Sequence, residues 1–247
     1  MKTIIKKEIL EGLNTLQYIS ESANKLLFLQ HGIFGSKEKI MNLLGVSFVK
    51  LGYHVIGIDA YKHGSRLAEP FISKDKDLCE LDASNVVRQT AEDILTIYTK
   101  HFKSQYKTFD IAGISMGGLT AYYLSTITED INHLIALISS PKFLEATKHR
   151  LPKNRQELYP NSDEVLKQVE AMDPSKNVDN MHFNTLIMFS GKEDKVIPYQ
   201  QSESFYQTYK DTKNIIFKTY KTEHKINKKM HEDLLDLLKK SYGGYDE

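Results

Sequence analysis

This chain of 247 residues has few cysteines, no long apolar run and little excess of charge of either sign, and each of these features excludes some classes of protein. Cys79 is the only cysteine, so an internal disulfide is excluded and a reducing compartment is expected. No run approaches the roughly 20 apolar residues of a membrane span, and residues 1–8 lack the apolar stretch of a secretion signal. We therefore predict a cytoplasmic protein without membrane contact.

Charge of one sign is also scarce, because 33 Lys and Arg residues balance 32 Asp and Glu residues and leave a formal net charge of +1. Such a chain has no overall field to attract a nucleic acid, so none is expected as a partner. The spacings C-x-x-C and H-E-x-x-H, the acidic calcium-loop pattern and the Walker loop do not occur. The sequence therefore predicts neither a metal nor a cofactor.

Short apolar runs alternate with amphipathic helical patterns along the chain, which indicates βα units around a largely parallel sheet. The predicted strands are residues 3–9, 13–19, 25–30, 54–59, 109–112, 133–139, 185–190 and 215–220. The predicted helices are residues 37–51, 83–101, 117–126, 200–209 and 224–240. We expect one domain, residues 1–247, with an eight-stranded, mostly parallel sheet flanked by helices.

One segment, residues 141–182, is longer and more polar than a single crossover between strands requires. Its prolines divide it into short helical pieces. An insertion at this point is expected to lie over the carboxyl-terminal edge of the sheet, where α/β sheets bind ligands. We therefore predict a small helical cap at about residues 141–182.

The sequence Gly113-Ile114-Ser115-Met116-Gly117 directly follows a predicted strand and precedes a predicted helix. G-x-S-x-G in this context predicts a nucleophile elbow, a strained turn that exposes the serine hydroxyl. A dinucleotide-binding fingerprint is a poorer match, because it requires glycine at position 115. A glycine-containing turn with an incidental serine is the structural alternative.

A serine hydroxyl needs a base to accept its proton, and the base needs an orienting acid. Behind an elbow of this type the expected chain order is serine, then acid, then histidine. Asp194 follows a predicted strand and is the candidate acid, with Glu193 as its nearest competitor. His224 follows the last strand and is expected to open the final helix, whereas His231 lies about two turns further on and is expected at the surface.

Two backbone N–H groups are candidates for the oxyanion hole that this chemistry requires. One belongs to Met116, directly after the candidate nucleophile. The other is expected from the loop His31-Gly32-Ile33-Phe34-Gly35-Ser36, where Ile33 is the favoured donor and Phe34 is adjacent. His31 itself is expected to be structural.

Five motifs occur in a characteristic order: H-G-x-x-G-S at 31–36, D-A-x-x-H-G-x-R at 59–66, G-x-S-M-G-G at 113–118, G-x-x-D-x-V-I-P at 191–198, and the late His224. Over roughly residues 20–240 the chain resembles small bacterial carboxylesterases of the α/β-hydrolase superfamily, near the prolyl-oligopeptidase and dienelactone-hydrolase branch. The resemblance implies an α/β-hydrolase fold and a triad of Ser115, Asp194 and His224.

The chain departs from these relatives in two places. Glu223 precedes His224, where many relatives have glycine. The nucleophile is Ser115, whereas the dienelactone enzymes use cysteine, and this argues against their chemistry.

The expected activity is that of a serine carboxylesterase, which hydrolyses short-chain acyl esters of small molecules through an acyl-enzyme. An aminopeptidase or acyltransferase on the same triad, and a non-catalytic ligand-binding module that retains the fold, are the alternatives. Arg66 is expected in an ion pair, with contact to a substrate carboxylate as the other possibility. Substrate choice is expected to depend on the cap and on the loop near residues 66–80, and the oligomeric state is left open.

Overall fold

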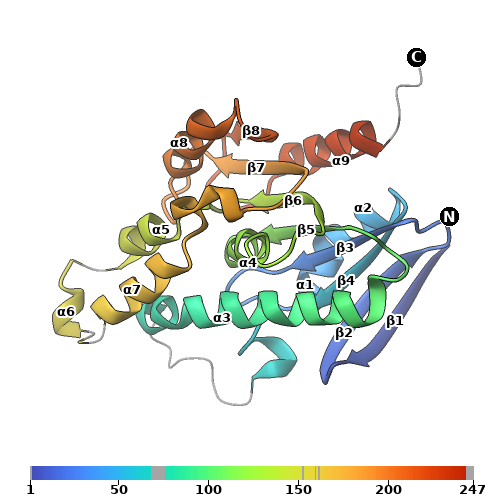
Figure 1. The fold of residues 1–247 in the computed structure, drawn as a ribbon, viewed down its shortest axis with the longest axis horizontal. Coiled ribbons are helices and arrows are strands. Elements are labelled where there is room, and N and C mark those ends of the chain that lie inside the picture. Colours follow the sequence, from blue (N-terminus) through green and yellow to red (C-terminus); the bar gives the residue numbers. More distant parts are fainter. Residues whose placement is uncertain (1, 68–75, 152, 159, 161, 243–247) are drawn as a thin grey trace.

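The structure is a computed structural model that describes residues 2–67, 76–151, 153–158, 160 and 162–242, and only the backbone of residues 76–81, 155 and 156. Eight strands form one sheet in the order β1-β2-β4-β3-β5-β6-β7-β8, running from the lower right to the top of Figure 1. The strands are β1 (Thr3–Leu10), β2 (Leu13–Ser20), β3 (Lys25–Gln30), β4 (Tyr53–Ile58), β5 (Phe109–Ile114), β6 (Ile131–Leu137), β7 (Thr185–Gly191) and β8 (Ile215–Tyr220). β2 pairs antiparallel with β1 and β4, and all other pairs are parallel. The predicted eight-stranded, mostly parallel sheet is confirmed.

Helices cover both faces of this sheet (Figure 1). They are α1 (Lys37–Ile40), the π-helical η1 (Met41–Gly45), α2 (Val46–Val49), η2 (Gly64–Arg66), α3 (Lys76–Ile97), η3 (Tyr98–Phe102), α4 (Met116–Leu124), α8 (Tyr199–Tyr209) and α9 (Lys228–Tyr242). Side chains alternate between the two faces along each strand. On β3, Leu26 and Phe28 pack with α3 and α4, whereas Leu27 and Leu29 pack with α1, α2 and α9. Among the described residues no helix is long and apolar enough to cross a membrane.

Several predicted boundaries move by a few residues. The helix predicted at 37–51 is the continuous segment α1–η1–α2, which ends at Val49, slightly before the predicted end, and is followed by a turn in which Gly52 takes a φ of 84°. The strand predicted at 133–139 runs instead from Ile131 to Leu137. The helix predicted at 83–101 begins earlier, at Lys76.

The segment predicted as a cap consists of short helices, as its prolines indicated. They are α5 (Phe143–Arg150), α6 (Arg155–Leu158), α7 (Ser162–Ala171), η4 (Pro174–Lys176) and η5 (Val178–Asn180). α7 packs against α5 and against α3, so this segment is joined to the helical layer on one face of the sheet. Most of the loop near 66–80, to which we assigned a part in substrate choice, lies outside the described residues, since 68–75 are not among them.

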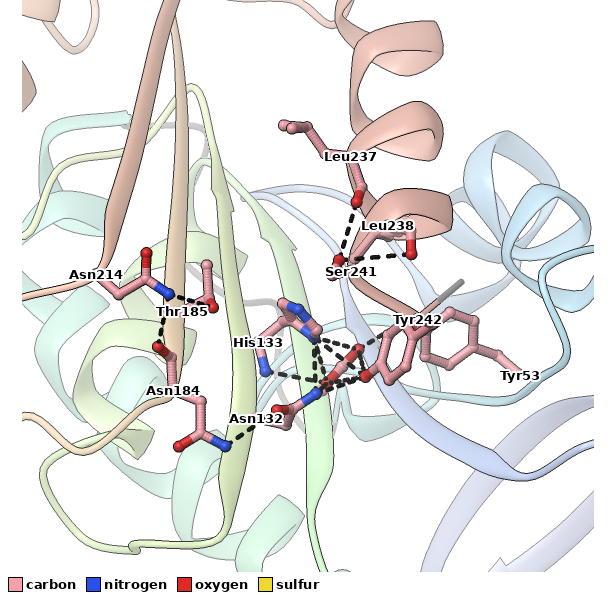
Figure 2. A network of polar contacts seen from close by, with 11 residues as sticks. Tyr53, Asn132, His133, Asn184, Thr185, Asn214, Leu237, Leu238, Ser241 and Tyr242 are labelled. Carbon is pink, nitrogen blue, oxygen red and sulfur yellow. Dashed lines mark hydrogen bonds and ion pairs between the residues drawn. The ribbon is translucent and has the colours of Figure 1, made fainter. Parts of the chain in front are cut away.

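A buried carboxylate joins the strands to α9 at the amino-terminal edge of the sheet (Figure 2). Asp110 on β5 accepts hydrogen bonds from the hydroxyl groups of Tyr53 at 2.5 Å and Tyr242 at 2.8 Å. It also accepts from the backbone N–H of His133 at 3.0 Å and from Asn132 at 3.2 Å. Because Tyr242 ends α9, this network fastens the last helix to the sheet, and it places His133 at the edge opposite the carboxyl ends of the strands, as predicted.

A second histidine, His54 on β4, gives the fold a testable dependence on pH. Its Nε2 lies 2.9 Å from Oε1 of Gln17, and burial, with Lys6 nearby, lowers its pKa from 6.5 to about 4. Below pH 6.5 His54 therefore binds a proton in the unfolded chain but not in the folded chain. The free energy of unfolding consequently decreases as the pH drops towards 4. We expect His54→Gln, which keeps an amide donor for Gln17, to remove about 2–3 kcal/mol of the loss between pH 7 and about 4.5.

Urea unfolding at both pH values measures this difference. His182→Gln serves as the control, because the His182 side chain makes none of the described hydrogen bonds or ion pairs, and it should keep the full acid-induced loss. Equal losses in wild type and His54→Gln would contradict the assignment.

Candidate active site

The turn between β5 and α4 has the strained backbone that the G-x-S-x-G pattern predicts. Ser115 takes φ 54° and ψ −115°, a region that L residues seldom occupy. A Cβ on Gly113 would lie 2.1 Å from the carbonyl carbon of Gly117, and a Cβ on Gly117 would lie 2.4 Å from the carbonyl oxygen of Gln30. Both glycines are therefore required by close backbone contact, and the turn holds the Ser115 side chain at the carboxyl end of β5.

Ser115, His224 and Asp194 meet at this edge although they lie far apart in the sequence. Nε2 of His224 lies 2.9 Å from Oγ of Ser115, and Nδ1 of His224 lies 2.7 Å from Oδ2 of Asp194. An ionised carboxylate only accepts hydrogen bonds, so Nδ1 carries the proton and Nε2 can accept from the serine hydroxyl. The structure thus brings together the three side chains selected from chain order.

The Asp194 carboxylate is held by more than the histidine. Its side chain is fully buried, and Oδ1 accepts the backbone N–H groups of Val196 at 2.8 Å and Ile197 at 2.9 Å. The neighbouring Glu193 is exposed. Of the two candidate acids, only Asp194 contacts His224 among the described contacts.

The loops that carry Asp194 and His224 lie directly against each other. A Cβ on Gly191 would lie 2.5 Å from the carbonyl oxygen of Thr222, and the N–H of Glu193 donates to that same oxygen at 3.0 Å. Gly191 ends β7, and its lack of a side chain allows this approach. The sequence placed Gly191 in a motif but gave no sign that it faces the histidine loop.

Two predictions about the last helix are wrong. His224 does not open it: α9 begins at Lys228, because the Asn227 side chain accepts the N–H of Met230 at 2.9 Å and caps the helix. His224 therefore lies on the loop between β8 and α9. His231 is not a surface residue but half-buried, and burial lowers its pKa.

The loop after β3 forms a tight turn beside the nucleophile. Gly35 donates its N–H to the carbonyl of Gly32 at 3.0 Å, and Phe34 has a φ of 57°, which together describe a turn of the type II class. A Cβ on Gly32 would lie 3.5 Å from Cβ of Ser115, so the turn contacts the elbow. Ile33 is at the second position of this turn and lines the same pocket as Ser115.

His31 links this turn to the segment that follows β4 through its two ring nitrogens. Its Nδ1 lies 2.7 Å from the carbonyl oxygen of Gly32, and its Nε2 lies 3.0 Å from the backbone N of Ala60. Since the Ala60 N–H can only donate, Nε2 must accept, and Nδ1 carries the proton. Burial lowers the pKa of His31 to about 4, which keeps the ring neutral. This is the structural role that was expected.

The D-A-x-x-H-G-x-R segment braces the same region through a buried ion pair. Asp59 accepts from the Lys37 ammonium at 2.6 Å and from the Ser65 hydroxyl at 2.8 Å. Burial acts to raise the pKa of Asp59, but hydrogen bonds from Lys37 and Ser65 outweigh it and hold that pKa below its usual value. Arg66 forms an ion pair with Asp93 at 2.7 Å, which is the first of the two roles expected for it.

A pocket of about 200 Å³ opens beside the nucleophile. Its described walls are mainly apolar and include Ile33, Leu119 and Ile197, while Arg150 at the end of α5 supplies a cation. No sequence motif signalled Arg150, because its place depends on how the cap packs. Arg66 is not among the described residues of this wall. Within the described part of the chain no group of His, Cys, Asp and Glu side chains is arranged to hold a metal ion.

The fold and its matches define the class of the protein. An eight-stranded, mostly parallel sheet between helices, with a serine elbow after β5, is an α/β-hydrolase fold. Residues 87–244 match the model of the prolyl oligopeptidase family, so the chain belongs to this family and is a serine hydrolase. The matched span contains Ser115, Asp194 and His224.

Individual relatives agree with this assignment. The chain is 23% identical over 222 residues to the Bacillus subtilis protein named "Putative esterase YitV", covering 83% of this chain and 84% of that one. The crystal structure of TT1662 from Thermus thermophilus superposes with a TM-score of 0.78 at 21% identity, covering 97% of this chain and 98% of the other. Est1E from Butyrivibrio proteoclasticus, solved with ferulic acid bound, superposes with a TM-score of 0.69 at 19% identity. The match covers 95% of this chain and 96% of Est1E.

Proposed function

We propose that the protein is a serine carboxylesterase that hydrolyses short-chain acyl esters through a triad of Ser115, His224 and Asp194. The observation that carries the proposal is the unbroken chain of hydrogen bonds from the buried Asp194 carboxylate through His224 to Oγ of Ser115. Nucleophile, base and orienting acid are thereby in contact in the order that acyl transfer requires.

The reaction follows from this geometry. Oγ of Ser115 attacks the ester carbonyl while Nε2 of His224 accepts the hydroxyl proton. The N–H groups of Met116 and Ile33 stabilise the oxyanion of the tetrahedral intermediate. When the intermediate collapses, the C–O bond to the alcohol breaks, and His224 returns the proton to the leaving alkoxide. Water then attacks the acyl-enzyme in the same way and releases the acid, which restores Ser115.

The proposal also has support from the relatives. YitV carries an esterase name, and Est1E was solved with ferulic acid, a carboxylic acid, bound to it. A pocket of about 200 Å³ with mainly apolar walls suits a small acyl or alcohol group. Acyl transfer to or from amides could use the same triad, so the substrate class requires a direct measurement.

Turnover of p-nitrophenyl acetate and butyrate, compared with the matching p-nitroanilides, tests the substrate class. We expect turnover of the esters and little of the anilides. A fluorophosphonate probe should label the protein once, on the peptide that contains Ser115. Faster turnover of the anilides would indicate a peptidase, and a protein that neither turns over esters nor reacts with the probe would be a non-catalytic relative.

The oxyanion donor of Ile33 can be removed without rebuilding its loop. Ile33 occupies the second position of a type II turn, where proline is favoured, and a proline there has no N–H. We expect Ile33→Pro to lower kcat for p-nitrophenyl butyrate by about 10²–10³-fold, with a much smaller change in KM.

Ile33→Ala is the matched control, because it removes the side chain and keeps the N–H. Its kcat should stay within a few fold of wild type. If Ile33→Pro retained full kcat, the second donor would be a different group, with the adjacent N–H of Phe34 as the first candidate.

A further inference from the structure

The outer edge of β1 has no strand partner within the described part of the chain, and β1 combines exposed isoleucines with charged residues. β1 ends the strand order of the sheet and pairs only with β2 among the described residues (Figure 1). Ile4 is 49% exposed, Ile5 62% and Ile9 67%. Unpaired edge strands can pair with other chains, and charged side chains on the edge, such as Lys6, Lys7 and Glu8, oppose this unless an opposite charge faces them. β1 therefore offers a second strand an unpaired backbone edge and three exposed isoleucine side chains.

The hairpin fixes which backbone groups face outward. Glu11 and Gly12 both have positive φ, 50° and 77°, which defines a two-residue turn of type I′. In such a hairpin the flanking pair, Leu10 and Leu13, is a hydrogen-bonded pair, and such pairs alternate along the strands. The outward N–H and C=O groups therefore belong to the odd-numbered residues, Thr3, Ile5, Lys7 and Ile9.

The charges of β1 are self-complementary when two copies run antiparallel. If Lys7 faces Lys7 of the second copy, Lys6 lies opposite Glu8, and Ile5 lies opposite Ile9. Each of these pairs occurs twice by symmetry. Lys6 and Glu8 already form an ion pair at 2.7 Å within the strand, so the two copies would bring together four alternating charges.

Neighbouring registers lack this match. Centring the pairing on Lys6 sets Ile5 against Lys7 and Ile4 against Glu8, and centring it on Glu8 sets Lys7 against Ile9. In the register centred on Lys7 the one unfavourable contact is between the two Lys7 side chains. Opposite-charge and apolar cross-strand pairs are stabilising, so four favourable pairs oppose one like-charge pair.

We propose that the protein forms a symmetric dimer in which the β1 strands of two copies pair antiparallel about a two-fold axis at Lys7. The two eight-stranded sheets thereby become continuous. Ile5 and Ile9 of the two copies extend the face of the sheet on which their β2 partners, Tyr18 and Asn14, lie. The hydrogen bonds of the interface come from Ile5, Lys7 and Ile9 of each strand, because Thr3 would face Glu11 in the turn of the other copy.

Cysteine cross-linking tests the register directly. In a Cys79→Ser background, which removes the sole native cysteine, Lys7→Cys places two sulfurs opposite each other at a hydrogen-bonded pair. At a hydrogen-bonded pair the two Cβ atoms are about 5.5 Å apart, which is too far for a direct disulfide, so a bis-methanethiosulfonate reagent with an ethane spacer is used to bridge the two sulfurs. Ile5→Cys is the matched control, because its two copies are offset by four residues, about 13 Å, along the strands. We expect this reagent to link Lys7→Cys and not Ile5→Cys.

Sedimentation of the wild-type protein over a range of concentrations measures the dimer without any variant. The dimer fraction should rise with concentration, should fall in Ile5→Lys, and should increase in Lys7→Thr, which removes the like-charge contact. Circular dichroism checks that each variant is folded. A wild-type protein that is monomeric throughout, a dimer that is unchanged by Ile5→Lys, or equal cross-linking of both cysteine variants would overturn the proposal.

Discussion

Ser115→Ala is expected to lower kcat for p-nitrophenyl butyrate by about 10⁶-fold, because no other group can form the acyl-enzyme at that position. The Ser115 Oγ is the only oxygen that contacts Nε2 of His224 among the described hydrogen bonds. Alanine keeps the backbone of the elbow and removes only this atom. The fold should therefore survive, and the thermal midpoint should stay near that of wild type.

Ser139→Ala supplies the control for this loss. Ser139 follows β6, the neighbouring strand of the sheet, and its buried Oγ has no hydrogen-bond partner among the described residues. Its removal should leave kcat within a few fold of wild type. A Ser115→Ala protein that turned over esters at the wild-type rate would reject the nucleophile assignment, whatever the labelling experiment gave.

Asp194→Asn is expected to lower kcat by about 10⁴-fold with little change in KM. The carboxylate accepts from Nδ1 of His224 and from two backbone N–H groups, and it therefore fixes the tautomer in which Nε2 is free to accept. An amide of nearly the same shape can place its own N–H towards Nδ1. The ring would then carry its proton on Nε2 and could not take the proton of Ser115.

Glu193→Gln is the matched control, because it makes the same chemical change one residue away on the same loop. Glu193 is exposed, so the loss of its charge should leave kcat unchanged. Steady-state kinetics of the two variants, measured side by side, decide which carboxylate serves the histidine. A large loss in Glu193→Gln with full activity in Asp194→Asn would exchange the two roles.

The fold and the three central side chains could be predicted because each depends on short segments of sequence. Ser115 is part of a local turn whose glycines are required by contacts within and beside it. Asp194 and His224 follow the ends of β7 and β8, and parallel strands bring their carboxyl ends to one edge of the sheet. Chain order and strand ends were therefore sufficient to select them.

The remaining features of the site depend on contacts between segments that no local pattern encodes. Arg150 on α5 reaches the pocket because α5 packs against α7 and α7 packs against α3, and the ion pair of Lys37 with Asp59 joins residues 22 positions apart. The start of α9 was misjudged for a different reason. Asn227 is a favourable helix cap and was visible in the sequence, but the amphipathic pattern appeared to begin at His224.

The contact between Gly191 and Thr222 has a consequence for engineering this enzyme class. Because the loops after β7 and β8 share one backbone interface, neither can be lengthened or exchanged alone without displacing the other. Transfer of the active site to a related protein would require the loops after β7 and β8 to be exchanged together. The turn after β3 is held by His31 and does not take part in that interface, but it packs against the elbow, so a redesign of this turn would have to keep the glycines at positions 32 and 117.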